Sequence, residues 1–212
     1  MLKSTRFLAP TLAVMCSVAF AARQDCTTQP GAAVGDGPVS AEAVFTTGEG
    51  FISITLSNLQ ADPRSAGQLL NGVAFTLSEG QTSGSLGPNS ANLRQVKSGG
   101  VFTDFGPSST GWALASDSGA GLRLCVLCSN LGAAGPSHLL IGGPAGSGRY
   151  ESANGSIAGN RPHNPFTAES ATFLVYVPGL TESSTVTSVT FFFGTQDGIT
   201  APGFCGGTPV LE

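Results

Sequence analysis

The sequence has few charged residues and no cluster of basic ones. Only 10% of its 212 residues are Asp, Glu, Lys or Arg, and the formal net charge is −4. Nucleic acids and anionic membrane surfaces attract proteins through patches of Lys and Arg, which this chain lacks. The charge pattern therefore argues against nucleic acid or an anionic membrane surface as a partner.

Common catalytic and cofactor-binding motifs are also missing. The sequence contains no Gly-x-Ser-x-Gly, His-Glu-x-x-His, P-loop or EF-hand pattern. The acidic residues are scattered, and those near glycines, such as Asp104, Asp117 and Asp197, are explained by turn chemistry. We therefore expect a non-enzymatic protein with no catalytic residue, no cofactor and no metal, and keep a hydrolase using loop carboxylates as a third reading.

Helical periodicity is nearly absent, while glycine and proline are abundant, with 30 and 13 copies. One short helix is plausible, over residues 62–70, because Asp62 and Pro63 form an N-terminal signal and Asn71-Gly72 a stop. Alternating apolar residues predict many short strands. They lie at residues 42–46, 50–56, 73–77, 93–96, 101–105, 112–115, 121–127, 138–141, 171–177 and 185–193. This spacing predicts an all-β fold, a single antiparallel β-sandwich or jelly-roll-like domain over residues 41–212. Residues 22–40 read as an irregular lead-in.

The last two predicted strands are the most strongly patterned. Residues 171–177 and 185–193 are dense in β-branched and aromatic side chains, which suit a pleated, half-buried surface. The seven residues between them are too few for a parallel crossover. We therefore expect these strands to form an antiparallel hairpin on which the others pack.

The first 21 residues have the order of features of a secretory signal peptide. Lys3 and Arg6 precede an apolar run from Phe7 to Phe20, and Ala19-Phe20-Ala21 supplies the small-x-small cleavage pattern. The apolar run is short for a membrane span. We therefore expect an exported protein, secreted or extracellular, with no membrane span after cleavage near Ala21.

Four cysteines follow the signal segment, and an exported protein with an even number favours disulfides. Three connectivities are possible, and we favour Cys26–Cys205 with Cys125–Cys128. The second bond requires a turn, because an extended Cys-Val-Leu-Cys segment would separate its Cα atoms by about 10 Å. A redox dithiol would need a helix after Cys125, which is not predicted, and a zinc site would need a second close pair.

The longest irregular stretch runs from Gly142 to Phe166 and carries most of the candidate binding residues. A loop of this length in a compact domain is often functional or mobile. Polar groups on a loop held by a rigid sheet are a common form of binding site, although they also satisfy loop backbone groups. The candidates are Arg149, Tyr150, Glu151, Arg161, His163 and Asn164. His138 opens a predicted apolar strand and is expected to be structural.

Several segments together resemble a known class of bacterial proteins. These are Gly142–Tyr150, Asn154–Asn160, His163–Phe166 and Thr187–Thr195, with Ile54–Leu59 and Leu69–Leu77 upstream. They are similar to secreted proteins of the PEP-CTERM (exosortase-sorted) surface class. The resemblance implies a role at the cell surface or in the extracellular matrix. The Pro-Glu-Pro motif, apolar helix and basic tail of that class do not follow Val210-Leu211-Glu212, so free secretion is the simpler expectation.

These observations lead to one main functional hypothesis and one alternative. The main hypothesis is an exported protein with a structural or surface-interaction role outside the cell. The alternative is a carbohydrate-binding module whose site is the 142–166 loop, with extracellular polysaccharide or surface matrix as the partner. An exposed Trp or Tyr in a compact groove would favour the alternative.

Overall fold

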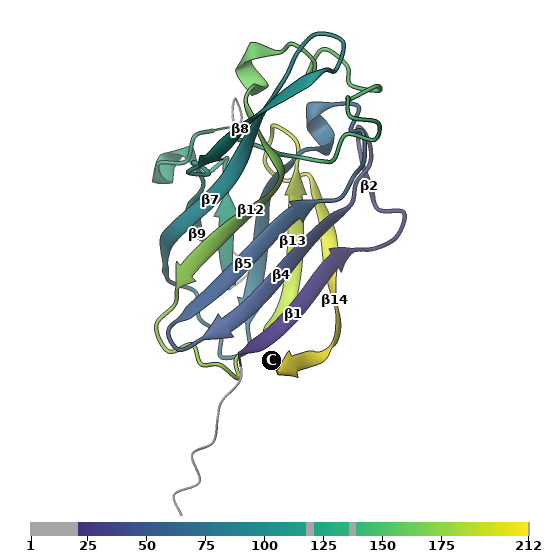
Figure 1. The fold of residues 1–212 in the computed structure, drawn as a ribbon. Coiled ribbons are helices and arrows are strands. Elements are labelled where there is room, and N and C mark those ends of the chain that lie inside the picture. The colour runs from purple at the N-terminus through teal and green to yellow at the C-terminus, as the bar shows by residue number, and fades with distance from the viewer. Residues whose placement is uncertain (1–20, 118–120, 136–138, 212) are drawn as a thin grey trace, which may run out of the picture.

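The computed structural model describes residues 21–117, 121–135 and 139–211, and nearly all regular structure in them is β-strand (Figure 1). Three short 3-10 helices and no α-helix occur in these ranges. The 3-10 helices are η1 (Ala66–Gln68), η2 (Ser129–Leu131) and η3 (Arg161–His163). The strands are β1 (Ala22–Thr28), β2 (Ala33–Val34), β3 (Gly37–Pro38), β4 (Ala41–Gly48), β5 (Phe51–Asn58), β6 (Leu70–Leu77), β7 (Ser85–Val96), β8 (Phe102–Ser108), β9 (Ala113–Asp117), β10 (Gly121–Cys125), β11 (Ile141–Gly142), β12 (Phe166–Tyr176), β13 (Val186–Phe193) and β14 (Thr200–Leu211).

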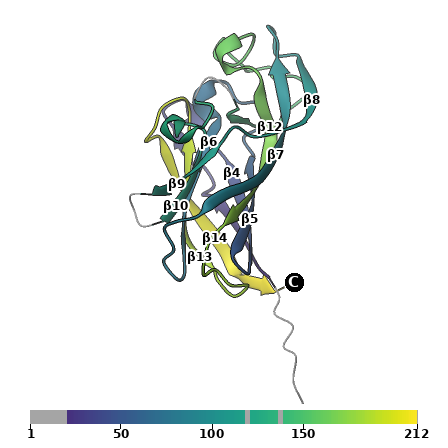
Figure 2. The same ribbon diagram turned by 90° about the vertical axis from the view of Figure 1, so that its left-hand side faces the viewer.

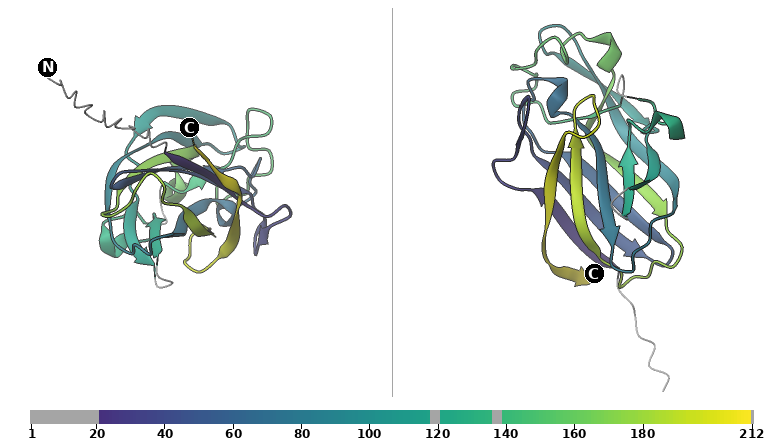
Figure 3. Two further views of the ribbon diagram at one scale, coloured as in Figure 1. Left: turned by 90° about the horizontal axis from the view of Figure 1, so that it is seen from below. Right: turned by 180° about the vertical axis from the view of Figure 1, so that it is seen from behind.

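The main sheet closes on itself, so the all-β prediction is confirmed but the sandwich or jelly-roll prediction is wrong. Seven strands pair in the order β12-β5-β4-β1-β14-β13-β6, all antiparallel. The two-residue strand β11 then joins the ends, because Ile141 pairs with Leu70 of β6 and with Thr167 of β12. The result is a closed eight-strand barrel whose strands surround the interior when seen from below (Figure 3, left).

Two pairs of strands extend from the closed ring. Strands β7 and β8 continue from β12, and β10 and β9 continue from β6. In the side view, β7 and β8 rise past the end of the ring on one side, while β9 and β10 lie on the other (Figure 2). Among the described strands, β8 pairs with β7 alone, and it is exposed along most of its length.

Inward-facing side chains of the ring form a continuous hydrophobic core. The alternation predicted for residues 50–56 is confirmed, since Ile52, Ile54 and Leu56 are completely buried. Aromatic pairs cross the interior, with ring centroids 5.3 Å apart for Phe45 and Phe75. Strands β4 and β5, which match the predicted strands at residues 42–46 and 50–56, pair as an antiparallel hairpin. The period of two in the sequence therefore identified which side chains point inward.

The predicted irregular lead-in is wrong over residues 22–28. This segment is β1, which lies between β4 and β14 and buries alternate residues, among them Gln24 and Cys26. Its inward row is mostly polar or small, so it carries no hydrophobic alternation. The side chain of Gln24 instead bonds to the backbone of Val186, accepting from its N–H at 2.5 Å. Residues 33–38 add the small β2–β3 hairpin.

The predicted hairpin of residues 171–193 is also wrong, although both of its strands exist. Strand β12 pairs with β5, β7 and β11, whereas β13 pairs with β6 and β14. The segment 177–185 therefore crosses from one side of the barrel to the other. The residue pattern specified two strands with buried faces but not their partners, which depend on the closure of the ring.

The predicted helix over residues 62–70 is reduced to the single turn η1. Its N-cap is Ser65, whose hydroxyl accepts from the Gly67 N–H, and the side chain of Gln68 completes the capping box. Asp62, the predicted N-cap, has a positive φ of 48° and accepts hydrogen bonds from Ser152. The predicted stop at Asn71-Gly72 lies within β6, where tertiary pairing overrides the local turn signal.

Both favoured disulfides are present. Cys26 of β1 and Cys205 of β14 are direct cross-strand partners with Cα atoms 3.9 Å apart. Cys125 ends β10, and the chain then turns so that its Cα lies 5.6 Å from that of Cys128. The turn that this bond requires is present, and it continues into η2 with a bond from the Leu131 N–H to the Cys128 carbonyl, at 2.9 Å. Cys16, His138 and the signal segment up to residue 20 lie outside the described residues.

Candidate functional site

The 142–166 loop lies at the upper end of the barrel in Figure 1 and is tied to two other loops. The N–H of Asn154 donates to the Arg64 carbonyl at 2.7 Å, and the N–H of Asp62 donates to the Pro144 carbonyl at 2.8 Å. Tyr150 makes a similar backbone bond, donating to the Gly100 carbonyl at 3.0 Å. The loop is therefore fixed to the residues around η1 and to the β7–β8 turn.

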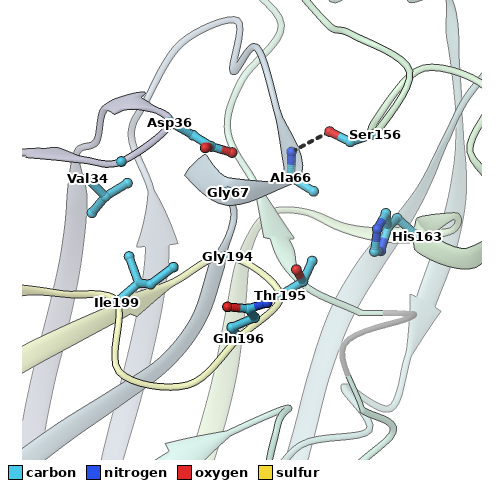
Figure 4. Close-up of a pocket in the computed structure, with 11 residues that line it drawn as sticks. Val34, Asp36, Ala66, Gly67, Ser156, His163, Gly194, Thr195, Gln196 and Ile199 are labelled. Atoms are coloured by element: carbon cyan, nitrogen blue, oxygen red, sulfur yellow. Dashed lines mark hydrogen bonds between the residues drawn. The ribbon is translucent and has the colours of Figure 1, made fainter.

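A cleft of about 280 Å³ opens between this loop, η1 and the turn after β13 (Figure 4). Its walls combine polar and apolar groups from five segments of the chain. The side chains that line it include those of Val34, Asp36, Ser156, His163, Thr195, Gln196 and Ile199. The cleft lies where the β2–β3 hairpin, η1, the 142–166 loop and the turn after β13 meet. Each of these segments contributes only a few of the lining residues.

The acidic group of the cleft is Asp36, which lies between β2 and β3 and packs against η1. The Asp36 carboxylate accepts a hydrogen bond from the Ser65 hydroxyl at 2.6 Å, next to the first turn of that helix. A Cβ at Gly67 would overlap this carboxylate, so glycine is required there for Asp36 to lie against η1. Asp36 is thus positioned by its neighbours and still presents an acceptor to the cleft.

The opposite side of the cleft carries His163, at the end of η3. In Figure 4 its imidazole and the Asp36 carboxylate lie on opposite walls, with Thr195 and Gln196 between them. His163 is the one residue of the six predicted candidates that lines this cleft. The arrangement offers one carboxylate, one imidazole and neutral hydrogen-bonding groups to a small polar ligand.

Two further candidates, Arg161 and Asn164, line a second, more open cleft of about 600 Å³ beside the β7–β8 turn. Lys97 also lines it, so this cleft has a basic character. Asn164 is nearly buried and its side chain is fully used by the backbone: Oδ1 accepts from the Val96 N–H at 2.6 Å, and Nδ2 donates to the carbonyls of Ile157 and Asn160. Asn164 therefore holds the loop in place and is not a binding group.

Tyr150 is likewise structural, and the predicted cluster of Arg149, Tyr150 and Glu151 does not converge on one site. The Tyr150 side chain is buried, and its hydroxyl donates to the Gly143 carbonyl at 2.7 Å. Burial raises the pKa of this phenol, although the nearby Arg94 guanidinium opposes the increase. Arg149 and Glu151 are exposed on the outer side of the loop, and Glu151 accepts from the Ser147 hydroxyl.

A charged network that the sequence patterns do not predict surrounds Arg94, whose side chain is 7% exposed. Its guanidinium donates to both Asp104 oxygens, at 2.6 and 2.8 Å, and also to the Tyr150 hydroxyl and the Glu169 carboxylate. It also lies 3.9 Å from the ring centroid of Phe102. The network joins β7, β8, β12 and the 142–166 loop. No local pattern signals it, because its members are far apart in the sequence.

This network predicts a defined pH dependence of stability. The hydrogen bonds from Arg94 hold the pKa of Asp104 below its ordinary value, so ionised Asp104 stabilises the folded state. That stabilisation is complete above the unfolded-state pKa of about 4 and is lost as the pH falls through the lower folded-state pKa. Asp104→Asn is expected to lower the denaturant midpoint at pH 7 and to flatten its fall between about pH 5 and pH 2.

Asp25→Asn is the matched control, because Asp25 also pairs with an arginine, Arg23, but both partners are exposed. Exposed pairs contribute about 0–1 kcal/mol, so this variant is expected to leave the pH profile nearly unchanged. If both substitutions flattened the pH dependence of the denaturant midpoint equally, the Arg94 network would contribute no more to stability than an exposed ion pair.

Within residues 21–117, 121–135 and 139–211, no group of three or more His, Cys, Asp or Glu residues is placed to hold a metal ion. Comparison with known proteins finds no match for this chain among family models, curated proteins or solved structures.

Proposed function

We propose that this protein is exported from a bacterial cell and acts outside it as a non-enzymatic structural or surface-interaction protein. The observation that carries the proposal is the state of its cysteines: all four that follow the signal segment are joined in disulfides. Disulfides form and persist in oxidising compartments and are rare in the cytosol. The N-terminal signal pattern and the resemblance to the PEP-CTERM surface class support the same proposal.

The form of the domain suits an extracellular setting. A disulfide between β1 and β14 joins the first and last strands of the ring, so it links the two ends of the folded chain. The 142–166 loop is tied to the barrel by backbone hydrogen bonds and by Asn164. Among the described residues, no helix is long and apolar enough to cross a membrane.

Carbohydrate binding by the 142–166 loop remains a second candidate function. Its support is the cleft beside His163, which presents neutral hydrogen-bonding groups such as Thr195 and Gln196. The sugar would be a small one, since the cleft is about 280 Å³ and most ligand pockets are about 300–1,000 Å³.

One experiment tests export and oxidation together. The full chain, expressed from Met1 in a Gram-negative host, is expected to appear outside the cytoplasm with an N-terminus near Ala22 and no alkylatable thiol. N-terminal sequencing and mass measurement after alkylation without reductant provide the two readouts. A product that still begins at Met1, or that takes up label on any cysteine after residue 21, would overturn the proposal. The same alkylation after reduction is the positive control and should label four cysteines.

A further inference from the structure

Two exposed aromatic side chains lie next to each other on the outer face of the barrel. Phe51 of β5 and Tyr176 of β12 are direct cross-strand partners, and the two residues are 36% and 46% exposed. Both point outward, because the alternate residues Ile52 and Val175 are buried. Most large apolar side chains of this protein are buried, so a paired exposure of two aromatic rings requires an explanation.

Glycines on the flanking strands let the two rings lie flat against the sheet. A Cβ at Gly48 of β4 would overlap the Phe51 ring, and a Cβ at Gly87 of β7 would lie 2.7 Å from Cε2 of Tyr176. Since the strand order is β7-β12-β5-β4, the two rings extend away from each other, each over the neighbouring strand. Each ring thus has one face against the backbone and the other face toward solvent.

The resulting surface is wider than a single aromatic side chain. Strands in a sheet are about 4.8 Å apart, so rings over the β4–β5 and β7–β12 boundaries have centres separated by about 10 Å. This spacing is close to the length of two sugar rings in an extended chain. The rings are also fixed before any ligand arrives, so little side-chain entropy is lost on binding.

Hydroxyl groups lie around the two rings, and the exposed charged residues that flank them, Glu49 of the β4–β5 turn and Arg23 opposite Thr46, are of opposite sign. Ser53 is exposed two residues beyond Phe51 on the same face, and its cross-strand partner Thr46 is half-buried. Ser85 is exposed opposite Tyr176. Hydroxyl groups both donate and accept hydrogen bonds, as sugar hydroxyls do, and they attract neither a cationic nor an anionic polymer.

From these observations we infer that Phe51 and Tyr176 form a binding platform for an extended, neutral, β-linked polysaccharide. A pyranose ring in such a chain has a face of C–H groups, which packs on the electron-rich face of an aromatic ring. Its equatorial hydroxyls would reach Ser53, Thr46 and Ser85. This platform lies on the side of the barrel, away from the 142–166 loop. The inference rests on the proposed extracellular function, since it supplies the partner for that role.

The test compares retention of the signal-cleaved, disulfide-bonded protein on microcrystalline cellulose and on chitin. Phe51→Thr and Tyr176→Thr remove the rings but keep side chains that favour strands. Each substitution is expected to weaken binding by about tenfold, and the double variant should abolish it. Tyr176→Phe should bind like the parent protein, because the ring and not its hydroxyl supplies the contact. Melting curves and thiol counts establish that each variant is folded and oxidised.

Phe105→Thr is the matched control, because Phe105 is also exposed (48%) but has no partner ring in the platform. Retention of this variant at the parent level, with loss in the two platform variants, would support the inference. Retention that is absent on both polymers, or that falls equally in the control, would overturn it. A dimer that dissociates on Tyr176→Thr, without polysaccharide binding, would overturn it in favour of a second copy as the occupant. None of these failures changes the N-terminus or the thiol count that test the proposed function.

Discussion

The double variant Cys26→Ala/Cys205→Ala is expected to lose about 5 kcal/mol of the free energy of unfolding in the loop-entropy model of disulfides. The bond joins residues 179 positions apart, so its removal frees nearly the whole domain in the unfolded state. A typical domain has only about 5–15 kcal/mol in total, and the variant should therefore be close to its unfolding threshold at 37 °C. Urea denaturation followed by circular dichroism measures the difference.

The second disulfide provides the control for this prediction. Cys125 and Cys128 are separated by three positions, so the same model gives about 2 kcal/mol for Cys125→Ala/Cys128→Ala. Both double variants remove two buried or half-buried sulfur atoms, and the loop length is the main difference between them. If the two variants lost equal stability, chain entropy would not be the source of the stabilisation by Cys26–Cys205.

The sequence predicted most strands of this fold because side-chain alternation reports burial directly. Phe173, Val175, Val189 and Phe191 are all buried, as their period of two requires. The same alternation carries no information about partners. A closed sheet and a sandwich bury the same alternate residues. The difference between them depends here on Ile141 and Gly142, which close the ring but form a segment too short to show any alternation.

The missed strands have polar or small inward residues. In β1 the buried positions hold Gln24 and Cys26, and the backbone ladder and the disulfide take the place of hydrophobic contacts. The C-terminal strand β14 contains Pro202 and three glycines, Gly203, Gly206 and Gly207, which are typical turn signals. Such strands form because they pair with a strand on each side. Their own residue pattern therefore predicts irregular structure.

In the predicted binding loop, too, nearness in the sequence did not predict which residues lie together in the structure. Residues from one loop were grouped by sequence proximity, but the structure divides them: Tyr150 and Asn164 are buried supports, while His163 and Arg161 line different clefts. The paired rings of Phe51 and Tyr176 were not recognised, because they lie 125 positions apart. Only the register of β5 and β12 brings them together.

The core and the 142–166 loop are expected to contribute very differently to the stability of the domain. Phe191 of β13 is completely buried, and its ring packs against the backbone of Gly203, where a Cβ would lie 2.9 Å from Cε2. Phe191→Ala should therefore cost about 3–5 kcal/mol, through lost burial and the cavity left behind. His163 is half-buried at the edge of a cleft, and His163→Ala should cost about 1 kcal/mol or less.

The two variants are to be compared by their denaturant midpoints at pH 7. Phe191→Leu is the control for the core position, since it keeps an apolar side chain and should recover part of the lost stability. Greater destabilisation by His163→Ala than by Phe191→Ala would mean that η3 is a structural plug of the barrel. The cleft beside His163 would then lose its role as a candidate sugar site, whereas the platform of Phe51 and Tyr176, on the side of the barrel, would be unaffected.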